Sequence, residues 1–311
     1  MQEFINKEFH HKELFTSKHR NNWFYKQIKQ ACPGKVCMDI GAGSGILSLF
    51  AIHAGAKHVY MVEHNPSCCS MIEKIFKSSK ISPEKYTLIK DQVNKDFIFT
   101  DKVDVIISET VSSNLLSQGY PGICRVVQNI KALKDAIIIP DKLYGSLVFF
   151  EDYSVLDEIN KYYTPEIITT GVKEIDDVYT FTSDMVEEVK PNISARMWRT
   201  VEEYYDLNQS HLNQHRNLWE KVKESKCHAI SDVITFDAYN LNSKFEWRTL
   251  CMIPNKTYGI MLIGALGCEG TSSTKHIMNL DVWGTYFYKF RKMSDILNIK
   301  FKEGNFEFQS I

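Results

Sequence analysis

An acid and three glycines at alternate positions form the most distinctive spacing in this sequence. Asp39, Gly41, Gly43 and Gly45 follow one another in the segment MDIGAGSGILSL, directly after a short apolar run. Glycine at every second position removes each Cβ that would hold a ligand away from the backbone. A further acid, Glu63, ends the next apolar run, HVYMV. We therefore expect a bulky ligand to lie against the glycines, with Glu63 close by.

The segments around these residues alternate between strand and helix patterns. Helical spacing of apolar residues predicts helices at residues 18–31, 46–56 and 71–79, and short β-rich runs predict strands at residues 35–40, 58–63, 86–90 and 103–108. Strands that alternate with helices form a parallel, doubly wound sheet. The glycine loop would lie at the carboxyl edge of that sheet, where doubly wound folds bind nucleotides.

The pattern changes after Pro140-Asp141, which is the best candidate for a domain boundary. Alternation of apolar and polar residues beyond it predicts antiparallel strands with one wet face, interrupted by a helical stretch at residues 196–225. The predicted strands cover residues 143–151, 233–241, 247–253, 258–266 and 282–290. We expect two domains, residues 1–140 and 141–311.

Charge and hydropathy exclude two classes of partner. Lys and Arg number 37 against 38 Asp and Glu, which gives a net charge of −1 and no electrostatic reason to expect nucleic acid or an anionic membrane surface. The N-terminus is polar, and no run of about 20 apolar residues occurs. We therefore predict neither a nucleic-acid nor a membrane partner, and a cytoplasmic location.

Cysteine and histidine spacing gives no metal site. The eight cysteines show no CxxC pair, which favours reduced thiols over a zinc site or a disulfide framework. His211 and His215 are four residues apart, but no third ligand has a clear spacing to them. We predict no bound metal.

The glycine spacing distinguishes between nucleotide ligands. The dinucleotide fingerprint is GxGxxG, whereas here the third glycine comes two residues after the second and Asp39 precedes the first. This arrangement resembles that of S-adenosylmethionine-dependent enzymes, whose ligand has no pyrophosphate. Glu63 is then placed to accept hydrogen bonds from both ribose hydroxyls. We predict S-adenosylmethionine as the cofactor.

Longer segments carry a more specific resemblance. The segment DIGAGSGILSLFAIHAGAKHVYMVE resembles the protein arginine methyltransferases almost position by position, and VDVIISETVSSNLLSQG stands where that family has its double-glutamate loop. ELFTSKHRNNWFY is similar to the family's N-terminal helix, in a form closest to the type III, monomethylating branch. The resemblance is strong over residues 11–140. It implies an α/β, doubly wound, Rossmann-like methyltransferase domain with an N-terminal lid helix, followed by a β-barrel-like domain with a helical insertion.

The resemblance assigns roles to residues beyond the glycine loop. Arg20 would pair with the carboxylate of the cofactor, for which a guanidinium offers a bidentate fork. Asn94 stands where the family has an acid that accepts the adenine amino group, and an amide oxygen can do the same. Glu109 is the first glutamate of the loop and would contact both cofactor and acceptor nitrogen. Leu14 and Trp283 would line the acceptor pocket.

Two departures from the family fall on the acceptor site. Gln118 stands where the second glutamate belongs and carries no charge, so cation binding should weaken by about 1.5–3 kcal/mol if nothing compensates. Val282 replaces the histidine of the family's Thr-His-Trp loop and can hold no carboxylate. Glu269, in the segment LGCEGTSS, is an alternative source of charge, or simply a hairpin-turn acid.

Three functional hypotheses remain open at this point. The first is an S-adenosylmethionine-dependent methyltransferase for a guanidino or amino nitrogen of a small molecule or peptide, and the second keeps protein arginine as the acceptor. The third is an inactive pseudoenzyme that serves as the partner subunit of an active methyltransferase. His10-His11 could supply a base for a neutral acceptor. The resemblance also implies a homodimer, with residues 194–226 as its candidate helical arm.

Overall fold

The structure is a computed structural model of the 311-residue chain. It describes residues 11–111, 119–150, 167–168, 170–182, 227–229, 234–241, 246–252, 259–269, 276–279, 286–289, 296–302 and 305–310.

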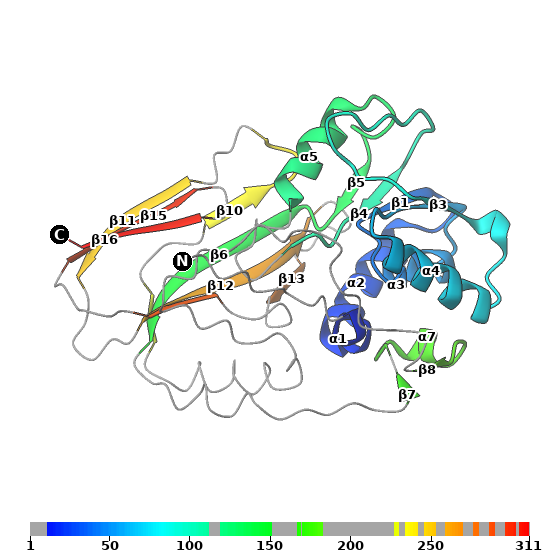
Figure 1. Cartoon of the computed structure of the whole chain (residues 1–311), viewed down its shortest axis with the longest axis horizontal. Coiled ribbons are helices and arrows are strands. Elements are labelled where there is room, and N and C mark those ends of the chain that lie inside the picture. The colour runs from blue at the N-terminus through cyan, green and yellow to red at the C-terminus, as the bar shows by residue number, and fades with distance from the viewer. Residues whose placement is uncertain are drawn as a thin grey trace.

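Five parallel strands form the first sheet, in the order β3-β2-β1-β4-β5 (Figure 1). Their bounds are β1 Val36–Ile40, β2 His58–Val62, β3 Tyr86–Ile89, β4 Val105–Ile107 and β5 Ile137–Ile139. The chain runs outward from β1 to β3 and then returns to the other side of β1, so the strand order reverses between β1 and β4. The doubly wound sheet is confirmed, and this reversal is the point where such sheets bind ligands.

Helices lie beside this sheet, as the apolar spacing predicted (Figure 1). They are α1 His11–Thr16, α2 Lys18–Ala31, α3 Ile46–His53, α4 Pro66–Ser78 and α5 Tyr120–Asn129, with a short 3-10 helix, η1, at Pro83–Lys85. Tyr25 of α2 packs edge-on against Phe50 of α3, with ring centroids 5.5 Å apart. Among the described helices, none combines the length and apolar character needed to cross a bilayer.

Helix boundaries were predicted with mixed success. The helix over residues 18–31 is confirmed, and Gly55, at φ 92°, ends the α3 segment as predicted. Helix α4 begins at Pro66, before the predicted start at residue 71. Its extra turn has a local cause, because the Asn65 side chain accepts a hydrogen bond from the Ser67 N–H and Pro66 suits the first helical position. Helix α5 was not predicted.

Antiparallel strands make up most of the rest of the described chain, and the alternation predicted five of them. A six-stranded sheet contains β6 Lys142–Phe150, β9 Cys227–Ala229, β10 Ile234–Asp237, β12 Gly259–Cys268, β13 His276–Asn279 and β14 Tyr286–Lys289. A three-stranded sheet contains β11 Glu246–Met252, β15 Ile296–Lys302 and β16 Asn305–Ser310. Strands β6 and β12 pair antiparallel along most of their length in the six-stranded sheet. The predicted helical stretch at residues 196–225 lies outside the described residues.

Hydrogen bonds join the two kinds of sheet where β5 leads into β6. The Tyr120 hydroxyl donates to the Pro140 carbonyl, and the Ile138 N–H donates to the Tyr239 hydroxyl at 2.8 Å. Asp141 is buried and accepts from the Glu269 N–H with both carboxylate oxygens, each at 3.0 Å. The antiparallel sheet is thereby fixed to the end of the parallel one.

A short segment from later in the chain lies against the N-terminal helices (Figure 1). It contains β7 Ile167–Ile168, α7 Lys173–Asp176 and β8 Phe181–Thr182. The Phe181 ring packs edge-on against Phe15 with centroids 4.8 Å apart, and Lys29 of α2 pairs with Glu174 at 3.3 Å. This segment therefore covers part of α1 and α2.

The contribution of the core can be tested with two isoleucines. Ile72 of α4 is fully buried, whereas Ile98 is 85% exposed. Ile72→Ala should lower the free energy of unfolding by about 2–5 kcal/mol because it deletes buried methyl groups and leaves a cavity. Ile98→Ala, the matched control, should change it by less than about 0.5 kcal/mol. Urea denaturation measures both, and equal losses would contradict the packing described for α4.

Candidate functional site

The glycine loop between β1 and α3 adopts a backbone that other residues would strain. Gly41, Gly43 and Gly45 have φ values of 75°, 57° and 77°, all in the left-handed region. A Cβ on Gly41 would lie 2.6 Å from the Thr110 methyl carbon, and one on Gly45 would lie 3.0 Å from the Phe76 ring. The alternating glycines therefore allow the loop both its conformation and its close packing.

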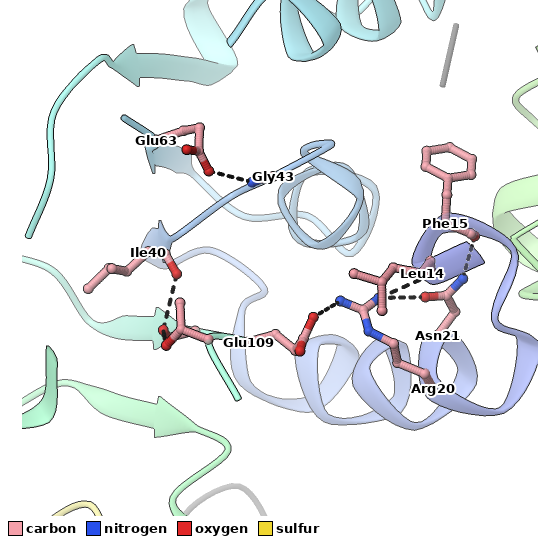
Figure 2. A network of polar contacts seen from close by, with 10 residues as sticks. Leu14, Phe15, Arg20, Asn21, Ile40, Gly43, Glu63 and Glu109 are labelled. Carbon is pink, nitrogen blue, oxygen red and sulfur yellow. Dashed lines mark hydrogen bonds and ion pairs between the residues drawn. The ribbon is translucent and has the colours of Figure 1, made fainter. Parts of the chain in front are cut away.

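Glu63 holds this loop against the end of β2. Its Oε2 accepts a hydrogen bond from the Gly43 N–H at 2.9 Å (Figure 2). Its Oε1 accepts one from the Asn65 N–H at 2.7 Å. The residue is 6% exposed. A carboxylate has about four acceptor positions, so these two bonds leave capacity for ligand hydroxyls. The predicted ribose contact is compatible with this geometry and stays a prediction.

Arg20 reaches from α2 to the far side of the same loop, where it meets Glu109 (Figure 2). Its Nη2 donates to the Glu109 Oε2 at 2.6 Å, and both side chains are almost completely buried. Its Nη1 donates to the Asn21 Oδ1 at 2.9 Å and lies 3.5 Å from the Leu14 carbonyl oxygen. The guanidinium also lies over the Phe24 ring, 5.2 Å from its centroid.

One N–H donor of Arg20 has no hydrogen-bond acceptor within the described part of the chain. Its Nε is buried there and has no hydrogen-bond partner. A buried N–H without an acceptor costs about 1–3 kcal/mol, which an anionic ligand group would recover. The arrangement fits the carboxylate end of the predicted cofactor.

Asp39, near the end of β1, interacts with the charged side chains of Arg20 and Glu63. It is 1% exposed and accepts a hydrogen bond from the Ser48 hydroxyl at 2.6 Å. Burial, together with a smaller effect of the Glu63 charge, raises the pKa of Asp39 to about 7, against the opposing effects of the Ser48 hydrogen bond and the Arg20 charge. Asp39 therefore lies close enough to Arg20 and Glu63 for all three to interact.

The loop after β4 is held to β1 by a hydroxyl. Ser108 Oγ donates to the Ile40 carbonyl at 3.1 Å and lies 3.2 Å from the Thr110 hydroxyl. This contact fixes the start of the loop that carries Glu109. The carboxyl ends of β1, β2 and β4 thus bring three predicted acids together with the predicted arginine.

Other predicted site residues lie apart from this group or outside the described residues. Asn94 is exposed after β3, and its Oδ1 accepts a hydrogen bond from the Asp96 N–H at 2.8 Å. Glu269 accepts a hydrogen bond from the Tyr144 hydroxyl at 3.2 Å and lies 3.8 Å from the Lys142 amine, which places it among residues of the antiparallel sheet. The residues outside the described part are His10, Gln118, Val282 and Trp283. In the described ranges, no group of three or more His, Cys, Asp or Glu side chains could hold a metal ion.

Comparison with known proteins relates the site to a family. A family described as conserved hypothetical protein 95 matches residues 16–109. Protein arginine N-methyltransferase 1 of Chlamydomonas reinhardtii is 38% identical over 121 residues, which are 38% of this chain and 34% of that protein. A probable protein arginine N-methyltransferase 1.2 of Arabidopsis thaliana is 31% identical over 179 residues, 57% of this chain and 44% of that protein. Over these aligned residues the chain is similar to the protein arginine N-methyltransferases.

The fold of a solved protein arginine methyltransferase extends over the rest of the chain. A structure described as the Trypanosoma brucei PRMT1 enzyme-prozyme heterotetrameric complex with AdoHcy has a TM-score of 0.59 at 16% identity, covering 93% of this chain and 86% of that one. This likeness confirms the Rossmann-like methyltransferase fold followed by a β-barrel-like part. The alignments with the two curated methyltransferases, by contrast, span less than half of those proteins. The type III character stays a prediction.

The spacing of residues did not reveal all the groups at this methyltransferase-like site. Ser48 and Thr110 were missed, because a serine inside an apolar helix and a threonine after a strand have no distinctive pattern. Asn21 lies within the family-like segment ELFTSKHRNNWFY, but the sequence predicted no role for it. Its contacts depend on segments that come together in the folded chain.

Asp39 gives a prediction on pH dependence in the ligand-free protein. Because its pKa is raised from the model-compound value of 3.8 to about 7, the folded state binds this proton more tightly than the unfolded state. Asp39 therefore destabilises the fold increasingly as the pH rises from about 4 to 7. Relative to wild type, Asp39→Asn should gain stability over this window, by up to about 1.4 kcal/mol for each pH unit.

Urea denaturation at pH 4, 5, 6, 7 and 8 measures the effect. Ser48→Ala should act in the opposite direction, because loss of the hydroxyl donor raises the pKa of Asp39 further and extends the decline to higher pH. Parallel profiles of stability against pH for wild type and Asp39→Asn would show that burial does not raise the pKa of Asp39.

Proposed function

We propose that the protein is an S-adenosylmethionine-dependent methyltransferase of the arginine methyltransferase type, acting on a guanidino or amino nitrogen. The observation that carries the proposal is the buried Arg20 guanidinium, which pairs with Glu109 and keeps Nε without a protein acceptor in the described part of the chain. A homologous fold whose description includes AdoHcy supports the choice of cofactor.

The cofactor would be held at its two polar ends. Nε of Arg20 would donate to its carboxylate, and Glu63 would accept from its ribose hydroxyls with the oxygens that already fix the glycine loop. Gly43 would let the ligand approach the backbone, while Gly41 and Gly45 would keep the loop in its left-handed, close-packed conformation beside it. Asn94 would accept from the adenine amino group.

The acceptor nitrogen would be oriented by the loop that begins at Ser108. Bound S-adenosylmethionine supplies a methyl group on a positively charged sulfur. Glu109, fixed by Arg20, would accept a hydrogen bond from the acceptor group and point its lone pair toward that methyl group, with Gln118 adding a neutral hydrogen bond. Leu14 and Trp283 would line the pocket and exclude water. The rate then depends on alignment and a preorganised electrostatic environment.

The neutral amide of Gln118 bears on the class of acceptor. With one carboxylate in place of two, the pocket holds less negative charge for a guanidinium. We therefore favour an acceptor that is less basic than arginine, or an arginine whose binding is supported by contacts elsewhere. A peptide, a protein or a small molecule satisfies this chemistry.

Two further parts of the proposal rest on sequence and resemblance. A homodimer follows from the family resemblance, and its candidate arm, residues 194–226, lies outside the described residues. A cytoplasmic location is supported by the eight cysteines without CxxC spacing.

The cofactor assignment can be tested by calorimetry with two ligands. S-adenosylhomocysteine carries an amino-acid carboxylate, whereas 5′-methylthioadenosine lacks it. Arg20→Lys should weaken binding of S-adenosylhomocysteine by about tenfold, because an ammonium cannot replace the guanidinium fork, and should change binding of 5′-methylthioadenosine by less than about twofold. Failure of the wild-type protein to bind either ligand would end the enzymatic proposal.

The acceptor assignment is tested by restoring the missing charge. Gln118→Glu should raise turnover on guanidinium acceptors by about tenfold, because a charged contact contributes about 1.5–3 kcal/mol. Methyl transfer to an arginine-rich peptide, free arginine and small guanidino compounds is measured by product mass, with Gln30→Glu, at an exposed position of α2, as a control for added charge. No gain with Gln118→Glu would indicate a pocket for another acceptor. Cofactor binding without transfer to any acceptor would favour the partner-subunit hypothesis.

A further inference from the structure

Asn21 is a completely buried amide beside the cofactor-binding arginine, and all of its described contacts are hydrogen bonds in good geometry. Its Nδ2 donates to the Phe15 carbonyl at 2.7 Å and to the Thr170 carbonyl at 2.8 Å. Its Oδ1 accepts from Nη1 of Arg20 at 2.9 Å (Figure 2). The amide thus connects three separate parts of the chain.

The chemistry of these partners fixes the direction of the amide. Two backbone carbonyls can only accept hydrogen bonds, so the nitrogen of Asn21 must face them. The amide oxygen is then directed at Arg20, which can only donate. With Nη1 held by Asn21 and Nη2 by Glu109, the guanidinium has a defined rotation, and its Nε is left for a ligand.

The Thr170 carbonyl is itself held firmly by the loop at residues 170–176. The Asp176 carboxylate accepts hydrogen bonds from the Thr170 N–H at 2.8 Å, the Thr170 hydroxyl at 2.9 Å and the Gly171 N–H at 3.0 Å. The Thr170 hydroxyl also accepts from the Val172 N–H at 3.1 Å, and Thr170 is completely buried. Hydrogen bonds therefore run continuously from Asp176 to Arg20.

We propose that Asn21 is a positioning residue for the carboxylate-binding Arg20, and that the 170–176 loop maintains it by presenting the Thr170 carbonyl. The inference rests on the proposed function and extends it to a loop 149 residues away in sequence. It predicts that damage to Asn21 or the loop affects ligands that carry a carboxylate and spares those that lack one. A role limited to packing would weaken both kinds of ligand alike.

The neighbouring Asn22 provides a matched control. Its Nδ2 donates to the Lys18 carbonyl at 2.8 Å and to the Gly171 carbonyl at 2.6 Å, so it contacts the same loop. Its amide is exposed, and both of these hydrogen bonds go to backbone carbonyls and not to Arg20. Asn22→Ala therefore removes a similar contact to the loop without removing the acceptor for Nη1.

The test is calorimetry of the full chain with S-adenosylhomocysteine and 5′-methylthioadenosine. Asn21→Ala should weaken S-adenosylhomocysteine binding by about tenfold, because one charge-assisted hydrogen bond to Arg20 is lost, and change 5′-methylthioadenosine binding by less than about twofold. Asn22→Ala should change both by less than about twofold. In an Arg20→Lys background, Asn21→Ala should have little further effect on S-adenosylhomocysteine binding.

The outcomes separate this inference from the proposed function. If wild type binds neither ligand, the cofactor site itself is wrong. If wild type binds S-adenosylhomocysteine but Asn21→Ala behaves like Asn22→Ala, or weakens both ligands equally, the positioning role is overturned. Should Asn21→Ala fail to fold, Asp176→Ala tests the same connection, with about threefold weaker S-adenosylhomocysteine binding expected and an equal effect on both ligands overturning it.

Discussion

The ion pair between Arg20 and Glu109 joins helix α2 to the loop after strand β4, with both side chains almost completely buried. Two charges removed from water are costly unless their remaining hydrogen-bonding groups are satisfied, and breaking such a pair leaves an uncompensated buried charge. The structure meets this demand for Nη1 and Nη2 of the guanidinium through Asn21 and Glu109. The rest of the site is arranged around this pair.

Backbone N–H groups of the glycine loop also need hydrogen-bond acceptors. Glu63, at the end of β2, accepts hydrogen bonds from the Gly43 N–H of the glycine loop and from the Asn65 N–H at the start of α4. The same carboxylate adds to the negative field that helps to raise the pKa of Asp39. Arg20 thus pairs with Glu109 and interacts with Asp39, which also interacts with Glu63, and a ligand with both anionic and hydroxyl groups would complement these side chains.

The sequence predicted most of the parallel sheet and helix α2, because the patterns that indicate these elements lie within short segments of the chain. Apolar spacing marked α2 and four of the five parallel strands, and Gly55 ended α3, since periodicity and capping act within a few residues. The early start of α4 was missed, although Asn65-Pro66 carries the capping information in its residue types. The candidate cofactor residues were also predictable, because an acid, alternating glycines and a strand-terminal acid have a recognisable spacing.

Contacts between distant segments could be decided only by the tertiary structure. Arg20 and Glu109 are 89 residues apart, and Asn21 and Thr170 are 149 apart, so no local pattern connects them. Their pairing depends on how α2 packs against the sheet and on how the 170–176 loop packs against α2, and close packing of side chains across the core determines both. By itself, the sequence determined which groups could bind a cofactor, through residue type and spacing. The folded chain decided which of those groups meet, because burial makes each polar group depend on a partner that lies far away in sequence.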